Sequence, residues 1–322
     1  MFGRAIAMNQ QPIDGYFCGC ADGVRRYDEA IKSTEILMAN RLRFAVAALL
    51  CAASFPALSY SSNCGDHFPG GSAPGVQDSE RLKVRILCYD QFAVVHSGVT
   101  KGPLIVSEHL RADHVKSAKE QIRVNLFHPE ARLNPPERAE PSDFARSGYD
   151  RGHMAPSGDM PDANSQAESF TLANMVPQDA QNNRYLCEAI ESATRAYVQR
   201  AGEAVVMTGP LFLGKRVESI GSGVLVPTHI FKLVYDPSRR AATVFLTENN
   251  ASKGYALISA MQLQQLTRVL LPRAVTAAAT SLAMPAPPAR SDRSAGTSSR
   301  RQSVYFEDAA LFTRALARKG AQ

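Results

Sequence analysis

The sequence predicts an α+β fold with a mainly antiparallel sheet and flanking helices. Apolar and polar residues alternate in "LKVRILCYDQFAVVHS", from residue 82, which is typical of two strands joined by a short turn. The runs "GVLVPTHIFKLVYD" and "AATVFLTEN" predict a second strand pair, and "EAVVMTGPLFL" before them predicts a buried strand. In residues 182–201 the apolar side chains recur at helical spacing as far as Gly202, which predicts a helix.

The length and composition are sufficient for a sizeable core. The 322 residues, 45% of them hydrophobic and 20% charged, can form one or two domains. Residues 60–272 are the predicted folded domain. The stretch 273–303 is biased to Ala, Pro, Ser and Arg and has no aromatic residue, so we expect it to be disordered. Residues 304–322 are compatible with one amphipathic helix.

Residues 38–59 have the order of a secretory signal peptide: basic Arg41 and Arg43, an apolar run, and small residues at a cleavage point. The alternative is a membrane anchor, but this run is shorter than the roughly 20 apolar residues that span a bilayer. The sequence therefore predicts a secreted or periplasmic protein with no membrane anchor after signal removal. It also predicts a translation start at Met38, which makes residues 1–37 a mis-assigned upstream segment.

Cys64, Cys88 and Cys187 remain after residue 59. An exported protein can hold a disulfide, and we expect Cys64 to pair with Cys88 because both flank the start of the domain. Cys187 is then a free thiol. A zinc site is disfavoured, because this region has no C-x-x-C or H-x-x-x-H pair. The net charge of +6 arises mainly after residue 272, so it is weak evidence for nucleic-acid binding by the domain.

Two segments carry side chains suited to catalysis. The first, "GYDRGHMAPSGDM" at residues 148–160, contains an Arg and a His two residues apart. In the second, residues 174–195, polar side chains four residues apart share one face of the predicted helix. These side chains are Asn183, Cys187, Glu191 and Arg195. A surface helix with a Glu191–Arg195 ion pair is the alternative interpretation.

Phosphodiester hydrolysis gives these side chains a common purpose. Negative charge builds up on the phosphate and on the leaving 3′-oxygen, where a cation can offset it. Mg²⁺ keeps most of its waters, so one neutral Asn carbonyl can be enough to hold it. A His that is not a metal ligand can take the proton from a water, and an Arg beside it can grip the phosphate.

"YDRGHMAPSGDM" followed by "LANMVPQDAQNNRYLCEAIESATR" resembles the DNA/RNA non-specific endonucleases of the ββα-metal (His-Me finger) class, over roughly residues 64–271. The resemblance implies an endonuclease domain at residues 60–272, with a ββα-metal finger between a strand ending at His153 and the helix after Asn182. By resemblance, His153 is the general base and Asn183 the sole protein ligand of Mg²⁺, for which Mn²⁺ or another divalent cation can substitute.

The resemblance assigns further residues to the site. A third Arg lies upstream of the motif near the phosphate; Arg123 is the best match, and Arg132 is the alternative. The other implied roles are phosphate contact for Arg151 and Arg195, ordering of metal-bound water for Glu191, and supporting hydrogen bonds for Asn174, Gln178 and Asp150. For Asp150, a hydrogen bond that shapes the turn is preferred over metal ligation. Asn182 is a less suitable ligand than Asn183, which lies eight residues before Glu191.

The chain departs from the family at two packing positions. Members usually carry a Trp at the position of Cys187 and another near Leu104, and this chain has no Trp. We expect these departures to affect stability more than chemistry.

The resemblance predicts a Mg²⁺-dependent endonuclease that hydrolyses DNA and RNA and leaves 5′-phosphates, and the signal pattern at residues 38–59 predicts that it is secreted or periplasmic. Little sequence preference is expected, because phosphate contacts carry no base information. Two other functions stay open: a non-catalytic nucleic-acid-binding protein of the same fold, and a secreted antibacterial toxin nuclease. Besides the DNA and RNA substrates, a homodimer and an immunity or inhibitor protein stay open as partners.

Overall fold

The structure is a computed structural model that describes residues 64–214, 217–252, 254–278 and 280–288. The predicted upstream segment 1–37, the predicted signal peptide 38–59 and the predicted C-terminal helix 304–322 lie outside these residues. None of the described helices is long and apolar enough to cross a bilayer.

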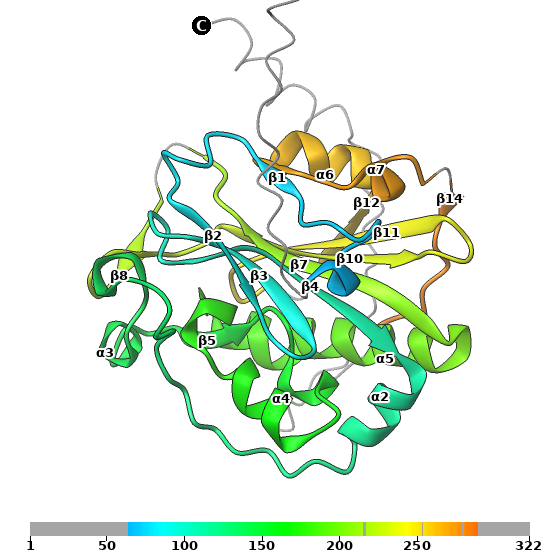
Figure 1. The fold of residues 1–322 in the computed structure, drawn as a ribbon, viewed down its shortest axis with the longest axis horizontal. Coiled ribbons are helices and arrows are strands. Elements are labelled where there is room, and N and C mark those ends of the chain that lie inside the picture. The colour runs from blue at the N-terminus through cyan, green and yellow to red at the C-terminus, as the bar shows by residue number, and fades with distance from the viewer. Residues whose placement is uncertain (1–63, 215–216, 253, 279, 289–322) are drawn as a thin grey trace, which may run out of the picture. The chain divides into compact units, whose positions relative to one another are not determined.

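A large sheet organises the described residues (Figure 1). Its strand order is β12-β11-β10-β7-β4-β3-β2, and neighbours along this path are antiparallel. The short strand β14 pairs with β11 in parallel. The predicted α+β class with a mainly antiparallel sheet is confirmed. The strands are β2 (Val84–Cys88), β3 (Phe92–Ser97), β4 (Gly102–Arg111), β7 (Glu203–Leu211), β10 (His229–Asp236), β11 (Ala241–Glu248), β12 (Tyr255–Ile258) and β14 (Thr280–Ser281).

Shorter strands pair in twos outside this sheet. They are β1 (Gly75–Val76) with β13 (Val269–Leu270), β5 (Asp150–His153) with β6 (Met175–Gln178), and β8 (Ser219–Ile220) with β9 (Val224–Leu225). The β5–β6 pair carries the Asp-Arg-Gly-His motif.

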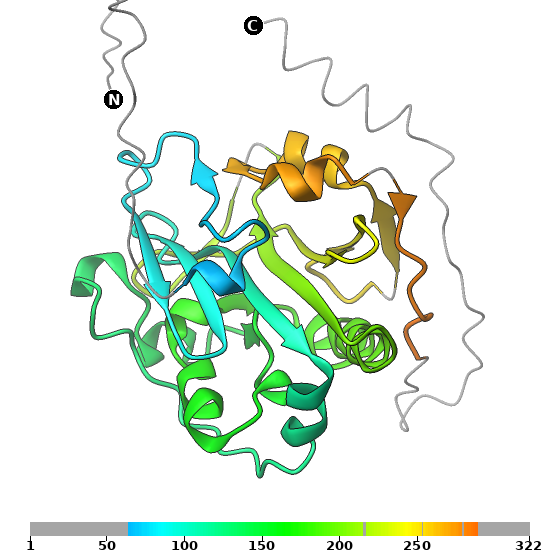
Figure 2. The same cartoon turned by 45° about the vertical axis from the view of Figure 1, so that its right-hand side comes forward.

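Helices cover both faces of the sheet (Figures 1 and 2). One face carries α2 (Ala112–Ala118), α4 (Ala163–Ser169) and α5 (Glu188–Ala201), and the other carries α6 (Ala260–Leu266) and α7 (Arg273–Thr276). The short helix α3 (Pro141–Phe144) precedes β5. The one-turn 3₁₀ helices are η1 (Gly65–His67), η2 (Pro135–Glu137), η3 (Ser157–Asp159) and η4 (Leu172–Asn174), and η5 (Asn182–Cys187) is a π-helical turn that continues into α5.

Strand β10 shows how the sequence divides the two faces, because successive strand residues point to opposite sides. Phe231 and Leu233 pack in the cluster that contains Leu263 of α6. Val234 packs in the cluster that contains Val198 of α5. Burying an apolar side chain of this size contributes about 1.5–3 kcal/mol. Lys232, between Leu233 and Phe231, is buried on the α5 side, where it lines the candidate site.

The segment 273–288 differs from the predicted disordered linker. It contains α7 and β14, and Val275 and Leu282 are buried. Val275 packs in the core cluster on the α6 side, and Leu282 packs in the cluster on the α5 side. The biased composition indicated disorder, but these apolar side chains reach opposite faces of the sheet. The remainder of the predicted linker, residues 289–303, lies outside the described residues.

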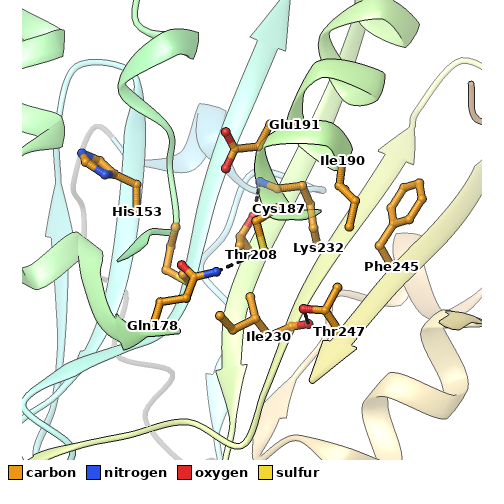
Figure 3. Close-up of a pocket in the computed structure, with 11 residues that line it drawn as sticks. His153, Gln178, Cys187, Ile190, Glu191, Thr208, Ile230, Lys232, Phe245 and Thr247 are labelled. Carbon is orange, nitrogen blue, oxygen red and sulfur yellow. Dashed lines mark hydrogen bonds between the residues drawn. The ribbon is translucent and has the colours of Figure 1, made fainter. Parts of the chain in front are cut away.

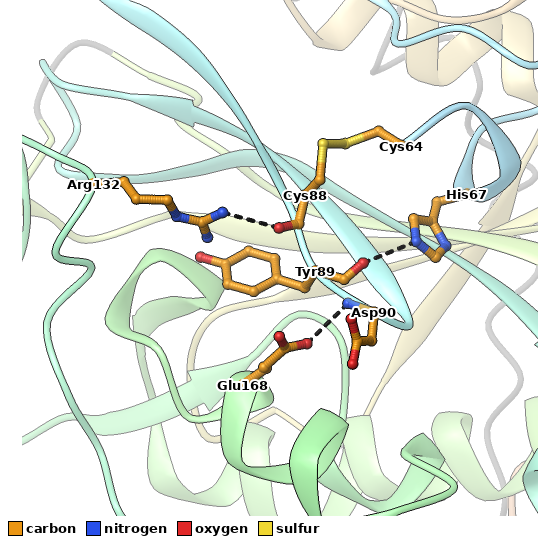
Figure 4. Close-up of a disulfide and its surroundings, with 7 residues drawn as sticks. All are labelled: Cys64, His67, Cys88, Tyr89, Asp90, Arg132 and Glu168. Atoms are coloured by element: carbon orange, nitrogen blue, oxygen red, sulfur yellow. Dashed lines mark hydrogen bonds between the residues drawn. A yellow bond between two sulfur atoms is a disulfide. The ribbon is translucent and has the colours of Figure 1, made fainter. Parts of the chain in front are cut away.

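A disulfide joins Cys64 to Cys88 and ties η1 to the end of β2 (Figure 4). Beside it, the ring Nε2 of His67 lies 3.1 Å from the carbonyl oxygen of Tyr89. Arg132 Nη1 donates to the carbonyl oxygen of Cys88 at 3.0 Å. Cys187 is a free thiol.

We expect the Cys64→Ser/Cys88→Ser variant to lose about 3 kcal/mol of free energy of unfolding, because the bond restricts the unfolded chain across a separation of 24 residues. Urea denaturation followed by circular dichroism measures the loss. A reducing agent should lower the wild-type midpoint toward that of the variant and leave the variant unchanged. Equal midpoints for the two oxidised proteins would contradict this expectation.

Candidate active site

Two short strands and a helix bring most of the sequence-predicted site residues together. In the β5–β6 pair, His153 lies opposite Met175 and Asp150 lies opposite Gln178. The chain then enters the π-helical turn η5 and continues as α5. Turns of this wider kind inside helices are frequent at functional sites. The arrangement is the strand–strand–helix finger that the two sequence motifs implied.

The side chain of Gln178 crosses over Gly152. A Cβ atom on Gly152 would lie 2.7 Å from Gln178 Cβ and 2.8 Å from Gln178 Cδ, closer than real Cβ contacts. From this position, Gln178 Nε2 donates to Asn182 Oδ1 at 2.7 Å and to Cys187 Sγ at 3.1 Å. The glycine before His153 therefore allows Gln178 to hold η5 against the strand pair.

We expect Gly152→Ala to lower the free energy of unfolding by about 1–3 kcal/mol, because the added methyl group overpacks the contact with Gln178. Denaturant unfolding measures the change. Gly254→Ala is the matched control, since a Cβ there meets nothing within 4 Å. Equal unfolding midpoints for the two variants would show that Gln178 moves aside without cost.

Asn174 fixes the backbone that follows His153. Its Nδ2 donates to the carbonyl oxygens of Ala155 and Ser169, both at 2.9 Å, and its Oδ1 accepts from Ala155 N at 2.9 Å. The side chain is fully buried, so losing these bonds would leave unpaired polar groups in the core. Asn174 thus sets the path of the chain just beyond His153.

The His153 ring packs against aromatic side chains. Its centroid lies 5.0 Å from that of Phe170, edge to face, and 5.9 Å from that of Phe127. The ring Nε2 is buried and has no hydrogen-bond partner among the described residues. Burial lowers the pKa of His153 to about 3, and the positive charge of Arg123 acts in the same direction. At neutral pH the imidazole is therefore uncharged and can accept a proton.

Two guanidinium groups share this aromatic shelf, which consists of Phe127, Phe144 and Phe170. Arg151 lies over Phe127 with its central carbon 4.9 Å from the ring centroid, and over Phe144 at 5.5 Å. Arg151 Nε is buried without a hydrogen-bond partner among the described residues. Arg123 lies 5.5 Å over Phe170. Both groups therefore hold a positive charge close to His153.

Arg132, the alternative to Arg123, lies at a different place. Its Nε donates to Glu130 Oε1 at 2.8 Å, and its guanidinium stacks 4.6 Å over the ring of Tyr89 beside the disulfide (Figure 4). The structure therefore brings Arg123, and not Arg132, to the shelf around His153.

The two neighbouring asparagines of η5 have different surroundings. Asn182 is fully buried, and its Nδ2 donates to the carbonyl oxygen of Glu248 at 2.8 Å. Asn183 is half-buried, and its Nδ2 donates to Asp150 Oδ2 at 3.0 Å. This bond uses the donating side of the Asn183 amide and leaves its carbonyl oxygen as the possible ligand. Asn182, in contrast, has the contacts of a structural residue.

The Asp150 side chain accepts its hydrogen bonds from two residues of η5. Besides Asn183, it accepts from Arg184 Nε at 2.8 Å and from Arg184 Nη2 at 2.6 Å. Burial raises the pKa of Asp150, but the hydrogen bonds from Arg184 and Asn183 outweigh it, so the pKa lies below its ordinary value. The bonds are those of a residue that shapes the turn.

Glu191 and Arg195 belong to a buried charged cluster under α5. Arg195 Nη1 lies 2.8 Å from Asp159 Oδ1 and 4.0 Å from Glu191 Oε2. Burial raises the pKa of Glu191 to about 7, although Lys232 and Arg195 oppose the shift. The Arg195 side chain is only 18% exposed, so its guanidinium faces carboxylates and not open solvent. The family resemblance had implied a phosphate contact for this group.

The cluster contains charges that the sequence interpretation missed. Lys232 Nζ donates to Thr208 Oγ1 at 2.8 Å, and Figure 3 shows the Lys232 side chain directed toward Glu191. Glu108 is buried in β4, and burial, followed by the negative charge of Asp159, raises its pKa well above the ordinary value. A sequence signal existed for Lys232, because this charged residue interrupts the apolar run of β10 between Phe231 and Leu233. Asp159 lies within the quoted motif itself.

A small pocket connects the His153 strand with this cluster (Figure 3). The small side chain of Cys187 lies at its wall, at the position where the family was expected to carry a Trp. Burial raises the pKa of the Cys187 thiol to about 12, so it is protonated at neutral pH. The residues that line the pocket are His153, Met154, Gln178, Cys187, Ile190, Glu191, Thr208, Ile230, Lys232, Phe245 and Thr247.

Several mitochondrial nucleases are similar to this chain in sequence. Human "Nuclease EXOG, mitochondrial" is 32% identical over an alignment of 158 residues, and the match covers 46% of this chain and 43% of that protein. The mitochondrial nuclease of Saccharomyces cerevisiae is 30% identical over 191 residues, 55% of this chain and 56% of that protein. Endonuclease G, mitochondrial, of Bos taurus is 30% identical over 207 residues, 60% of this chain and 66% of that protein. The chain spans about half the length of the curated relatives it matches.

A solved structure of an EndoG/EndoGI complex, described as showing the mechanism of EndoG inhibition, has a similar fold. The TM-score is 0.53 at 25% sequence identity, and the match covers 62% of this chain and 93% of that chain.

The predicted secreted or periplasmic location is wrong by these comparisons, because the human, bovine and yeast relatives are named mitochondrial nucleases. The error has a physical basis. Secretory signals and mitochondrial transit peptides both combine basic with apolar residues and avoid acidic ones, as residues 38–59 do.

The family model for the DNA/RNA non-specific endonucleases matches residues 72–273, which are more than half of the chain. The matched region contains both sequence motifs and the strand–strand–helix finger. The resemblance predicted from those motifs is confirmed, and the chain belongs to the DNA/RNA non-specific endonuclease family.

Proposed function

We propose that this protein is a divalent-cation-dependent endonuclease that hydrolyses phosphodiester bonds of DNA and RNA with little sequence preference. One observation carries the proposal: an uncharged His153 shares an aromatic shelf with Arg151 and Arg123. The strand that carries His153 begins at Asp150, which contacts Asn183. A proton acceptor, two phosphate-binding cations and a metal-ligand candidate are the groups that this reaction needs. Membership of the endonuclease family supports it.

His153 is the proposed general base. Its pKa near 3 keeps the imidazole uncharged, and the packing of Phe170 and Phe127 holds the ring in place. A base with a low pKa is a weak proton acceptor in isolation. We therefore propose that a bound phosphate, which places negative charge next to the ring, raises the pKa of His153 when the substrate enters.

Arg151 and Arg123 are the proposed phosphate contacts. Stacking on phenylalanine rings orients each guanidinium, and Arg151 Nε has no protein partner among the described residues. Arg195 differs, because Asp159 already holds it. We assign Arg195 to positioning Glu191, 4.0 Å away, and not to direct phosphate contact.

Mg²⁺ is the proposed cation, and the Asn183 carbonyl oxygen its protein ligand. The donor set suits Mg²⁺, which prefers oxygen ligands and retains several of its waters. Within the described residues, no group of three or more His, Cys, Asp or Glu side chains could hold a metal. When bound, the cation supplies positive charge for the leaving 3′-oxygen. Glu191 at the pocket wall is the proposed carboxylate that orders water nearby.

Cleavage assays with two substrates test this function. Purified protein is incubated with supercoiled plasmid and with single-stranded RNA, in Mg²⁺ or in EDTA. We expect both substrates to be degraded in Mg²⁺ only. A folded protein that binds both nucleic acids but cleaves neither, with any divalent cation, would replace this proposal by the non-catalytic binding function.

A further inference from the structure

The carboxylate of Asp150 contacts the proposed metal ligand, Asn183. Asp150 Oδ2 accepts a hydrogen bond from Asn183 Nδ2 at 3.0 Å. The nitrogen and the carbonyl oxygen of that amide share one carbon, so a cation on the oxygen would lie near the Asp150 carboxylate. Mg²⁺ usually takes carboxylates in preference to neutral amides. The structure therefore raises the question of what keeps Asp150 from becoming a ligand.

Arg184 also donates hydrogen bonds to the Asp150 carboxylate. Its Nη2 donates to Asp150 Oδ1 at 2.6 Å, and its Nε donates to Asp150 Oδ2 at 2.8 Å. Together with Asn183, three hydrogen bonds use both oxygens of Asp150. A bidentate arginine–carboxylate pair of this kind is stronger and more directional than a single hydrogen bond. The Asp150 side chain is 19% exposed, so solvent competes for it less than for a surface carboxylate.

We infer that Arg184 acts as a charge lock: it neutralises Asp150 and so restricts the protein ligands of the cation to the Asn183 amide. This inference rests on the proposed function, because it assumes a cation at Asn183. Arg184 does not touch the cation or the substrate in this role; it acts through Asp150 and is a positioning residue. Its place in the π-helical turn, next to Asn183, brings both donors to the same carboxylate.

The lock predicts a gain in metal affinity on removal of Arg184. Two unit charges about 4 Å apart in water interact by about 1 kcal/mol, which corresponds to about fivefold in affinity. Arg184→Gln should therefore tighten Mn²⁺ binding, measured by electron paramagnetic resonance of the free ion, by about fivefold or more. Damage to the fold would produce the opposite change. The Arg184→Gln/Asp150→Asn double variant should return to wild-type affinity or below.

Arg200→Gln is the matched control. It removes an equal charge from an exposed position in the last turn of α5, four helical turns from Arg184, beyond the screening length of about 8–10 Å at physiological salt. Its Mn²⁺ affinity should equal that of the wild type. Thermal unfolding of each variant confirms that it is folded.

The outcomes separate this inference from the proposed function. If Asn183→Ala and the wild type bind Mn²⁺ equally, the cation is not bound at Asn183, and both that part of the proposed function and the charge lock fail. If Asn183→Ala weakens binding but Arg184→Gln leaves the affinity unchanged or lowers it, the cation site stands and the charge lock is wrong. Tighter binding in Arg184→Gln that persists in the double variant would also overturn it, because the gain would not depend on Asp150.

Discussion

His153→Ala should reduce the single-turnover rate of plasmid cleavage by about 10²–10⁴-fold, the range typical for loss of a general base. His153 is not a proposed metal ligand, and its ring is uncharged at neutral pH. The affinity for Mn²⁺ should therefore change by less than about twofold. Single-turnover cleavage and Mn²⁺ titration on one protein preparation measure the two quantities.

His109→Ala is the control for this variant. His109 lies at a different position on β4, where its ring nitrogen is 2.9 Å from Glu203 Oε2. Its removal should leave cleavage unchanged. A His153→Ala protein that lost Mn²⁺ binding but kept partial activity would show that His153 is a metal ligand and not the general base.

Asn183→Ala should raise the Mg²⁺ concentration for half-maximal cleavage by at least about tenfold. Loss of a residue that only supports a ligand commonly costs ten- to a hundredfold in metal affinity, so the ligand itself should cost no less. The free energy of unfolding should change little, since Asn183 is half-buried and its recorded side-chain bond is to Asp150. Cleavage rates over a Mg²⁺ titration and urea unfolding give both values.

Asn182→Ala is the contrasting variant at the next position. Asn182 is fully buried and bonded to Gln178 and to the backbone of Glu248, so its removal should lower stability first. An Asn182→Ala protein that needed more Mg²⁺ than Asn183→Ala, at unchanged stability, would move the ligand to Asn182.

Much of the finger was predictable from local patterns. The four-residue spacing from Asn183 to Arg195 predicted one helical face, and the structure has the helix there, with its first turn widened to a π-helix. The apolar runs around β10 and β11 predicted a strand pair, and the two strands are antiparallel neighbours in the sheet. These features depend on residues close in sequence, where spacing alone determines which side chains lie together.

The rest depends on contacts between distant segments. The aromatic shelf joins Phe127, Phe144 and Phe170, which lie too far apart in the sequence for local spacing to relate them. Asp159 accepts a hydrogen bond from Arg195, which lies 36 residues away in the sequence. Composition predicted disorder after residue 272, but Val275 and Leu282 are buried against opposite faces of the sheet.

The central claim is that a water activated by His153 attacks phosphorus and displaces the 3′-oxygen. Identification of the new chain ends after cleavage of one short DNA and one short RNA of the same sequence tests it most directly. The proposed chemistry predicts 5′-phosphate and 3′-hydroxyl ends from both substrates. A 2′,3′-cyclic phosphate from RNA, or 3′-phosphate ends from DNA, would contradict it, because the bond to the 5′-oxygen would then be the one that breaks.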